Sequence, residues 1–150
     1  MTWRFEDAVP GSTIAHPRGR TITPDEHARL AWLTDNASAV HGDAHRAAAG
    51  PFGQVVVLGA LTVAIVLGLA EPVVAEPALA GRAAPTGWRR IALTATVVGG
   101  DTLSAVSRIH AVRPDADGRG GRVRRTVEGL DQHGRVVARI EEERWAPASR

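Results

Sequence analysis

The sequence contains no cysteine, no lysine and no tyrosine. The absence of cysteine and the absence of lysine each exclude a kind of chemistry. Without cysteine there is no thiolate nucleophile, no disulfide and no cysteine-ligated zinc or iron–sulfur centre. Without lysine there is no Schiff-base residue, which also removes ordinary pyridoxal-phosphate catalysis. The sequence therefore predicts neither a metal centre of these kinds nor a covalently held cofactor, and we expect no cofactor at all.

Aromatic residues are also scarce, at 4% of the chain, and the net charge is only +2. All 18 of the basic residues counted as lysine or arginine are arginines. The arginines near Arg122, Arg124 and Arg125 could meet the phosphates of a ligand, or simply form a solvated strand face. Because no aromatic platform accompanies them and the net charge is low, we do not expect nucleic-acid binding.

The chain begins with charged residues and has no apolar segment typical of a secretory signal, so we expect a cytoplasmic protein. One stretch, Val55 to Ala70, is almost wholly apolar. It is shorter than the roughly 20 residues that a membrane-spanning helix needs, and Glu71 closes it. We therefore interpret it as a buried helix and expect no membrane association.

The N-terminal half predicts helices separated by a polar loop. Thr23, Pro24 and Glu26 form a capping box with proline at the first helical position, which predicts a helix ending near Thr34. We expect Leu30 and Leu33 to form its apolar stripe, with Trp32 alongside. A short helical turn over Asp43–Ala49 and a long helix from about Gln54 to Ala70 follow, and Glu71–Gly87 is expected to be an irregular connection.

The C-terminal half changes to the period of β-strands, and turn-forming residues separate the strands. We expect strands within Trp88–Val97, Leu103–Ala111, Val123–Leu130 and Val136–Trp145, with Arg113–Gly121 as a loop. Near the N-terminus, Trp3–Ile14 is expected to hold a strand and a turn, and His16–Arg20 a loop. Successive strands with short turns favour an antiparallel meander, and one buried helix on such a sheet is an α+β layer.

Three stretches carry a resemblance to a known family: Gly19-Arg20-Thr21-Ile22-Thr23, Leu33-Thr34 followed by His41-Gly42-Asp43, and Gly59-Ala60-Leu61. On these residues the chain resembles the MaoC-like dehydratases, hot-dog folds related to the (R)-specific enoyl-CoA hydratases. The resemblance covers Phe5 to about Trp145 and is closest to the mesaconyl-CoA hydratase-like members. It implies one hot-dog domain over residues 1–150, with a long buried central helix wrapped by an antiparallel sheet. Because one such sheet leaves an open edge, we also expect a homodimer.

The resemblance also implies a site. In register with the family motif, His41 stands at the catalytic histidine, while Asn36 occupies the position of the catalytic aspartate. Asp35 is adjacent and could substitute for it. Gly59 stands where a backbone N–H stabilises the thioester oxygen, although Leu58 replaces the neighbouring histidine. The implied reaction is the hydration of an enoyl thioester or the reverse dehydration, which makes the protein a hydro-lyase acting on acyl-CoA or acyl-carrier-protein thioesters.

Two other functions remain open on the same fold. The replacements at Asn36 and Leu58 favour a non-catalytic subunit that binds an acyl chain or completes a heterodimer. A thioesterase would need a carboxylate near the thioester, for which Asp35 and Asp43 are candidates, although Asp43 is more typical of a helix N-cap. The four-residue spacing of His41 and His45 resembles that of metal ligands, but no glutamate accompanies the pair, so we predict no metal site.

Overall fold

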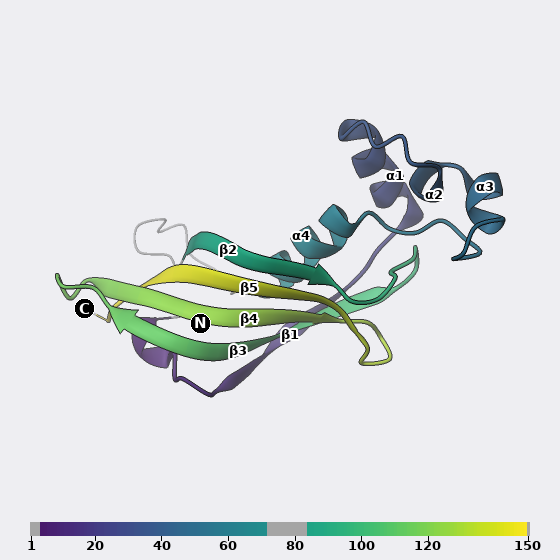
Figure 1. Ribbon diagram of the computed structural model, residues 1–150. Helices are drawn as coiled ribbons and strands as arrows, with labels where there is room; N and C mark the ends of the chain where they lie inside the picture. Colours follow the sequence, from purple (N-terminus) through teal and green to yellow (C-terminus); the bar gives the residue numbers. More distant parts are fainter. Residues whose placement is uncertain (1–3, 72–83, 150) are drawn as a thin grey trace.

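A computed structural model of the protein describes residues 4–71 and 84–149. Its centre is a five-stranded antiparallel sheet with the strand order β1-β3-β4-β5-β2 (Figure 1). The strands are β1 (Thr13–Thr21), β2 (Ala84–Leu93), β3 (Thr102–Pro114), β4 (Gly120–Leu130) and β5 (Val136–Pro147). The helices are η1 (Phe5–Asp7), α1 (Pro24–Leu33), α2 (Ala39–Gly42), α3 (Ala44–Ala48) and α4 (Gly59–Leu69). The expected α+β architecture is confirmed.

Helix α4 packs against the sheet and forms most of the core. Its buried residues are Leu61, Thr62, Ile65, Val66 and Leu69. They meet the helix-facing residues of the strands, among them Leu103, Ala105, Val127, Ala138 and Ile140. The outward side of α4 carries only small residues, Ala60, Ala64 and Gly68. Over the described residues, no helix is long and apolar enough to cross a membrane.

The predicted start of this helix was wrong by five residues, since α4 begins at Gly59 and not near Gln54. Val56 forms a β-bridge with Val98, and the N–H of Val57 donates to the carbonyl of Val97 at 2.8 Å. Three consecutive β-branched valines favour this extended pairing over a helix. The chain therefore turns from a strand-like segment into a helix at Leu58 and Gly59.

The predicted meander holds only for β3, β4 and β5. Strand β2 pairs with β5 and not with β3, which follows it in sequence. After β2 the chain crosses the end of the sheet, where the N–H of Thr94 donates to the carbonyl of Val137 at 3.0 Å. This crossing places β1 and β2 at the two edges of the sheet.

Several strand boundaries also differ from the expected ones. The loop predicted at His16–Arg20 lies within β1, where the pairing with β3 becomes irregular between Ala15 and Gly19. Pro17 lies in this interval and lacks the N–H that a regular ladder requires. The loop predicted at Arg113–Gly121 is shorter, because β3 and β4 pair as far as Pro114 and Gly121. The strand predicted within Trp3–Ile14 was wrong, since this stretch contains η1 and β1 begins only at Thr13. Strand β2 begins at Ala84, inside the predicted connection, and ends at Leu93. Residues 72–83 of that connection lie outside the described residues.

Helix α1 begins and ends as predicted, but of its predicted apolar stripe only Leu30 packs against the core. Thr23 caps it, and Glu26 closes the capping box. The residues that α1 buries are His27 and Ala31, whereas Trp32 is 85% exposed and Leu33 79% exposed. Helices α1, α2 and α3 gather beyond one end of the sheet, near the start of α4 (Figure 1). Among the described residues, only the inner side of α1 is therefore covered.

A cluster of charged side chains is buried at the other end of α4. The Nε of Arg125 donates to Glu142 at 2.7 Å, and both side chains are almost fully buried. Arg144 donates through two nitrogens to the carboxylate of Glu71, each at 3.0 Å. Arg125 also donates to Ser107 Oγ at 3.3 Å, and the same oxygen lies 2.8 Å from His16 Nε2. Burial, together with the charge of Arg125, lowers the pKa of His16 to about 4.

We predict that His16 makes the protein less stable as the pH falls from about 6.5 to about 4. Its pKa in the folded protein lies below the unfolded value of 6.5, so protonation favours unfolding in this window. The contribution is complete above the unfolded value and is lost on the way down to the folded one. Urea unfolding at several pH values should therefore show a smaller loss of stability for His16→Gln than for the wild type.

The matched control is His110→Gln, because His110 is exposed and its Nε2 lies 2.7 Å from the Thr126 hydroxyl. This variant should follow the wild-type pH dependence. Equal pH dependence of wild type and His16→Gln would contradict the assignment.

We also predict that Gly129→Ala destabilises the fold. A Cβ on Gly129 of β4 would collide with the side chain of Val66 in the middle of α4. Overpacking of this kind costs about 1–3 kcal/mol. Gly87→Ala in β2 is the control, since a Cβ there meets nothing within 4 Å, and its effect should stay within about 0.5 kcal/mol. Urea unfolding at one protein concentration compares the two variants, and equal midpoints would refute the close approach of α4 to β4.

Candidate functional site

The helices beyond the end of the sheet, with the segments around Gln54 and Gly99, line an open cavity of about 560 Å³. Its size lies within the range of small-molecule sites, about 300–1,000 Å³. Most of its lining is apolar, and its polar side chains are those of His27, Asn36, His41 and Gln54. The remaining lining residues are Pro24, Ala28, Ala31, Trp32, Gly42, Ala44, Val55 and Gly99. The residues predicted at Asn36 and His41 are thus brought together, while no carboxylate of the described residues lines this cavity.

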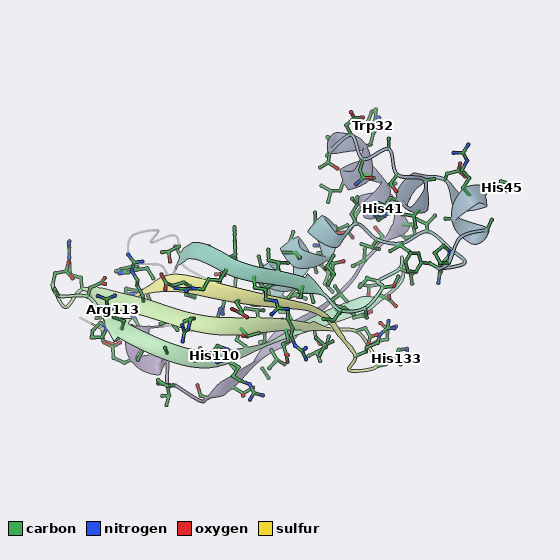
Figure 2. The ribbon with its side chains drawn as sticks, in the orientation of Figure 1. Trp32, His41, His45, His110, Arg113 and His133 are labelled. Carbon is green, nitrogen blue, oxygen red and sulfur yellow. The ribbon has the colours of Figure 1, made fainter. Side chains whose placement is uncertain are left out.

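His41 lies on the short helix α2, on the side of the helical group that faces α4 (Figure 2). Its ring is partly buried, and its Nδ1 lies 2.7 Å from the carbonyl oxygen of Val56. Because a carbonyl oxygen can only accept, Nδ1 must carry the proton. The neutral ring therefore keeps its lone pair on Nε2, the nitrogen that a general base would use.

Asn36 lies in the loop between α1 and α2, where its side chain forms a local turn. Its Oδ1 accepts the N–H of Ser38 at 3.1 Å, and its own N–H donates to the carbonyl of Ala31 at 2.9 Å. The Nδ2 group of Asn36 remains as a donor at the cavity. An amide cannot act as a base, but it can orient a water molecule or a substrate oxygen.

Asp35 is not part of this arrangement. Its side chain is exposed, and its φ of 50° is a left-handed conformation that aspartate tolerates better than most residues. Asp35 shapes the turn after α1, where its N–H donates to the carbonyl of Trp32 at 3.1 Å. The structure therefore separates Asp35 from the cavity that Asn36 and His41 line.

Gly59 is the first residue of α4 and follows the backbone segment in which the carbonyl of Val56 accepts the ring proton of His41. The N–H groups in the first turn of a helix have no acceptor within the helix and lie at the positive end of its dipole. A Cβ on Gly59 would collide with the flexible end of the Leu93 side chain. Gly59 lies outside the residues that line the cavity, so its role as the donor to a thioester oxygen stays a prediction.

The site also contains His27, which the sequence pattern did not single out. It is only 3% exposed, and its ring lies edge-on to that of His41 with centroids 5.9 Å apart. One indication was available in the sequence: His27 precedes Ala31 by one helical turn, so both lie on the same face of α1. That face is the one that α1 buries.

Other candidates from the sequence have structural roles. Asp43 caps α3 by accepting the N–H of Arg46 at 3.0 Å, as expected. Arg125 is buried against Glu142, so it cannot meet a ligand phosphate, while Arg122 and Arg124 lie on the exposed face of the same strand. Within residues 4–71 and 84–149, no group of three or more histidine, cysteine, aspartate or glutamate residues could hold a metal ion.

Comparisons with a family model and with solved structures show proteins of the same fold. The family described as MaoC-like domain matches residues 6–129. The MaoC-like dehydratase from Rhodospirillum rubrum is 20% identical, with a TM-score of 0.83 and 99% of each chain covered. The R-hydratase PhaJ1 from Pseudomonas aeruginosa is 22% identical, with a TM-score of 0.75, covering 97% of this chain and 86% of that one.

A third solved structure is the 3R-hydroxyacyl-ACP dehydratase complex HadBC from Mycobacterium tuberculosis. It is 14% identical, with a TM-score of 0.70, and the match covers 91% of this chain and 96% of that one. At these identities the likeness shows the fold. A search of curated proteins finds no match to the sequence.

Proposed function

The chain belongs to the MaoC-like domain family, and we propose that it hydrates an enoyl thioester or dehydrates a 3-hydroxyacyl thioester. The observation that carries this proposal is the placement of His41. Its Nδ1–H is held by the carbonyl of Val56, and its ring lines a largely apolar cavity. A neutral imidazole with a lone pair on Nε2 is the group that proton transfer near neutral pH requires.

In the hydration direction, His41 Nε2 takes a proton from water while the water oxygen bonds to the β-carbon. The electron pair of the carbon–carbon double bond moves through the α-carbon to the thioester oxygen and forms an enolate. The N–H of Gly59, at the positive end of α4, stabilises this oxygen. The proton then passes from His41 to the α-carbon as the thioester carbonyl re-forms, so the charges and protons balance and no cofactor is needed.

Asn36 holds the water in this scheme. Its Nδ2 donates to the water oxygen, while its Oδ1 stays with the N–H of Ser38. An aspartate in this position could keep the Ser38 contact with one carboxylate oxygen and face the cavity with the other. Asn36 and His41 line the same cavity, and in this scheme His41 is the base while Asn36 orients the water.

The substrate class is an acyl thioester of CoA or of an acyl carrier protein, and the protein is a cytoplasmic hydro-lyase. A thioesterase is less well supported, because Asp35 is exposed and Asp43 caps α3. The second candidate function is an accessory subunit that binds an acyl chain or completes a heterodimer, which the replacement of the family aspartate by Asn36 favours.

We predict that His41→Ala lowers kcat by about 10²–10⁴-fold on a thioester that the wild type converts, because the only base is removed. The fold should persist with a loss of about 1 kcal/mol, since one hydrogen bond to Val56 disappears. The assay follows the absorbance of the conjugated enoyl thioester with crotonyl-CoA and a branched enoyl-CoA. His45→Ala on α3 is the control, because His45 is exposed, and it should match the wild type. Full activity of His41→Ala would refute the assignment.

Asn36→Asp should hold or raise the rate in the same assay, because it adds a carboxylate beside His41 while keeping the acceptor for Ser38. Thermal unfolding checks that the loop remains intact. Activity in Asn36→Asp with an inactive wild type would support the accessory subunit instead. A folded Asn36→Asp variant that loses the wild-type activity would contradict the role of Asn36.

The homodimer is proposed to form through the edge strand β2, where Trp88, Ile91 and Leu93 are each about half exposed. Pairing of two β2 edges would satisfy open backbone groups and cover these side chains. We predict a dimer by light scattering at micromolar concentration and a monomer for Ile91→Arg. Val9→Arg alters a similarly exposed apolar residue that lies before β1, and it should remain dimeric. A monomeric wild type, or dissociation by both variants, would overturn this interface.

A further inference from the structure

His27 is the most deeply buried side chain at the cavity, and both of its ring nitrogens contact backbone atoms. Its Nε2 lies 2.8 Å from the carbonyl oxygen of His41, so it must donate. Its Nδ1 accepts the N–H of Leu58 at 3.3 Å. Only the neutral ring with its proton on Nε2 satisfies both contacts.

These contacts join three segments that are far apart in the sequence. His27 belongs to α1, His41 to α2, and Leu58 immediately precedes α4. The ring of His41 in turn donates to Val56, whose N–H donates to the carbonyl of Val40 at 3.0 Å. These hydrogen bonds link α1 to His41, His41 to Val56, and Leu58 to α1. The backbone from Val56 to Leu58 completes the circuit.

The circuit connects the two ends of the proposed chemistry. One end is the imidazole of His41, the base; the other is the first turn of α4, where Gly59 follows Leu58. A base and a donor for the enolate oxygen must be held at a set separation, because misplacement by about 1 Å can lower a rate about 10²-fold. We propose that His27 is a positioning residue that sets the separation between His41 and the start of α4. This role rests on the proposed hydratase function.

An apolar side chain in place of His27 could fill the space but could not make these two hydrogen bonds. Leu58 is 6% exposed, and its N–H and the carbonyl of His41 would each lose the polar partner that His27 supplies. Leaving such buried groups unpaired costs about 1–3 kcal/mol each, unless the backbone shifts to find other partners. Any such shift would move His41 relative to α4, so His27 acts on the reaction through geometry.

The test compares His27→Phe, which fills the space without hydrogen bonds, with His27→Gln, whose amide can both donate and accept. In folded His27→Phe, kcat should fall about 100-fold while KM changes less than about threefold, because only 3% of His27 is exposed at the cavity and its effect acts through the placement of His41. His27→Gln should recover at least a tenth of the wild-type kcat. His45→Phe, an exposed histidine on the same group of helices, is the matched control and should keep the wild-type kcat.

A second measurement does not depend on turnover. Two-bond ¹⁵N–¹H correlations of the histidine rings report which nitrogen carries the proton. In the wild type we expect the proton on Nε2 of His27 and on Nδ1 of His41. His27→Phe should shift the His41 ring signals as its contact with Val56 loosens, whereas His45→Phe should leave them in place. If the wild type converts no thioester, these spectra still test the positioning role, so its failure can be told from failure of the proposed function.

The proposal is overturned by a folded His27→Phe variant with wild-type kcat and unshifted His41 signals. It is also overturned by a His27→Gln variant that is no better than His27→Phe. If His27→Phe does not fold, His27→Gln carries the test alone: it should keep the Nδ1 proton signal of His41, and loss of that signal in the folded variant refutes the role of His27.

Discussion

The burial of α4 against the sheet is the constraint on which the rest of the molecule depends. Leu61, Ile65, Val66 and Leu69 face the strands, and Gly129 lets the helix approach β4 closely. Burial of such side chains contributes about 1.5–3 kcal/mol each to stability, so moving this helix along the sheet would lose much of that free energy. Because the buried residues set where α4 lies along the sheet, they also set where its first turn emerges.

The site is built at that first turn from backbone groups as much as from side chains. The segment Val56–Leu58 pairs with Val97 and Val98, accepts the ring proton of His41, and donates to His27. One short backbone segment thus anchors a β-bridge and two histidine rings. Hydrogen bonds in a partly dry environment are stronger than in water, so the polar groups of the site are held in place by a rigid neighbour.

The two buried polar clusters of this protein differ in kind. At the start of α4 the cluster consists of the rings of His27 and His41 and the backbone groups that they contact. Near the other end of the helix, Arg125 and Arg144 are matched by Glu142 and Glu71. Removing one partner of such a buried ion pair commonly costs about 3–5 kcal/mol, so this cluster is suited to holding the sheet and helix together. The proposed site and the buried ion pairs therefore lie at opposite ends of α4.

The sequence by itself determined the features that depend on neighbouring residues. The capping box at Thr23, the cap at Asp43, the apolar helix before Glu71 and the turn between β4 and β5 all follow from local side-chain chemistry and periodicity. The motif around His41 also pointed to the loop that meets the cavity, because its residues are close together in the sequence.

Only the tertiary structure decided which of these residues meet. The valines before Gly59 are extended because Val97 and Val98 lie beside them, and β2 pairs with β5 because the chain crosses the end of the sheet. His27 is buried because α1 turns that face toward His41 and Leu58, while Leu33 is left outside. These outcomes depend on contacts between residues 14 to 61 positions apart, and helical period or strand alternation carries no information about such contacts.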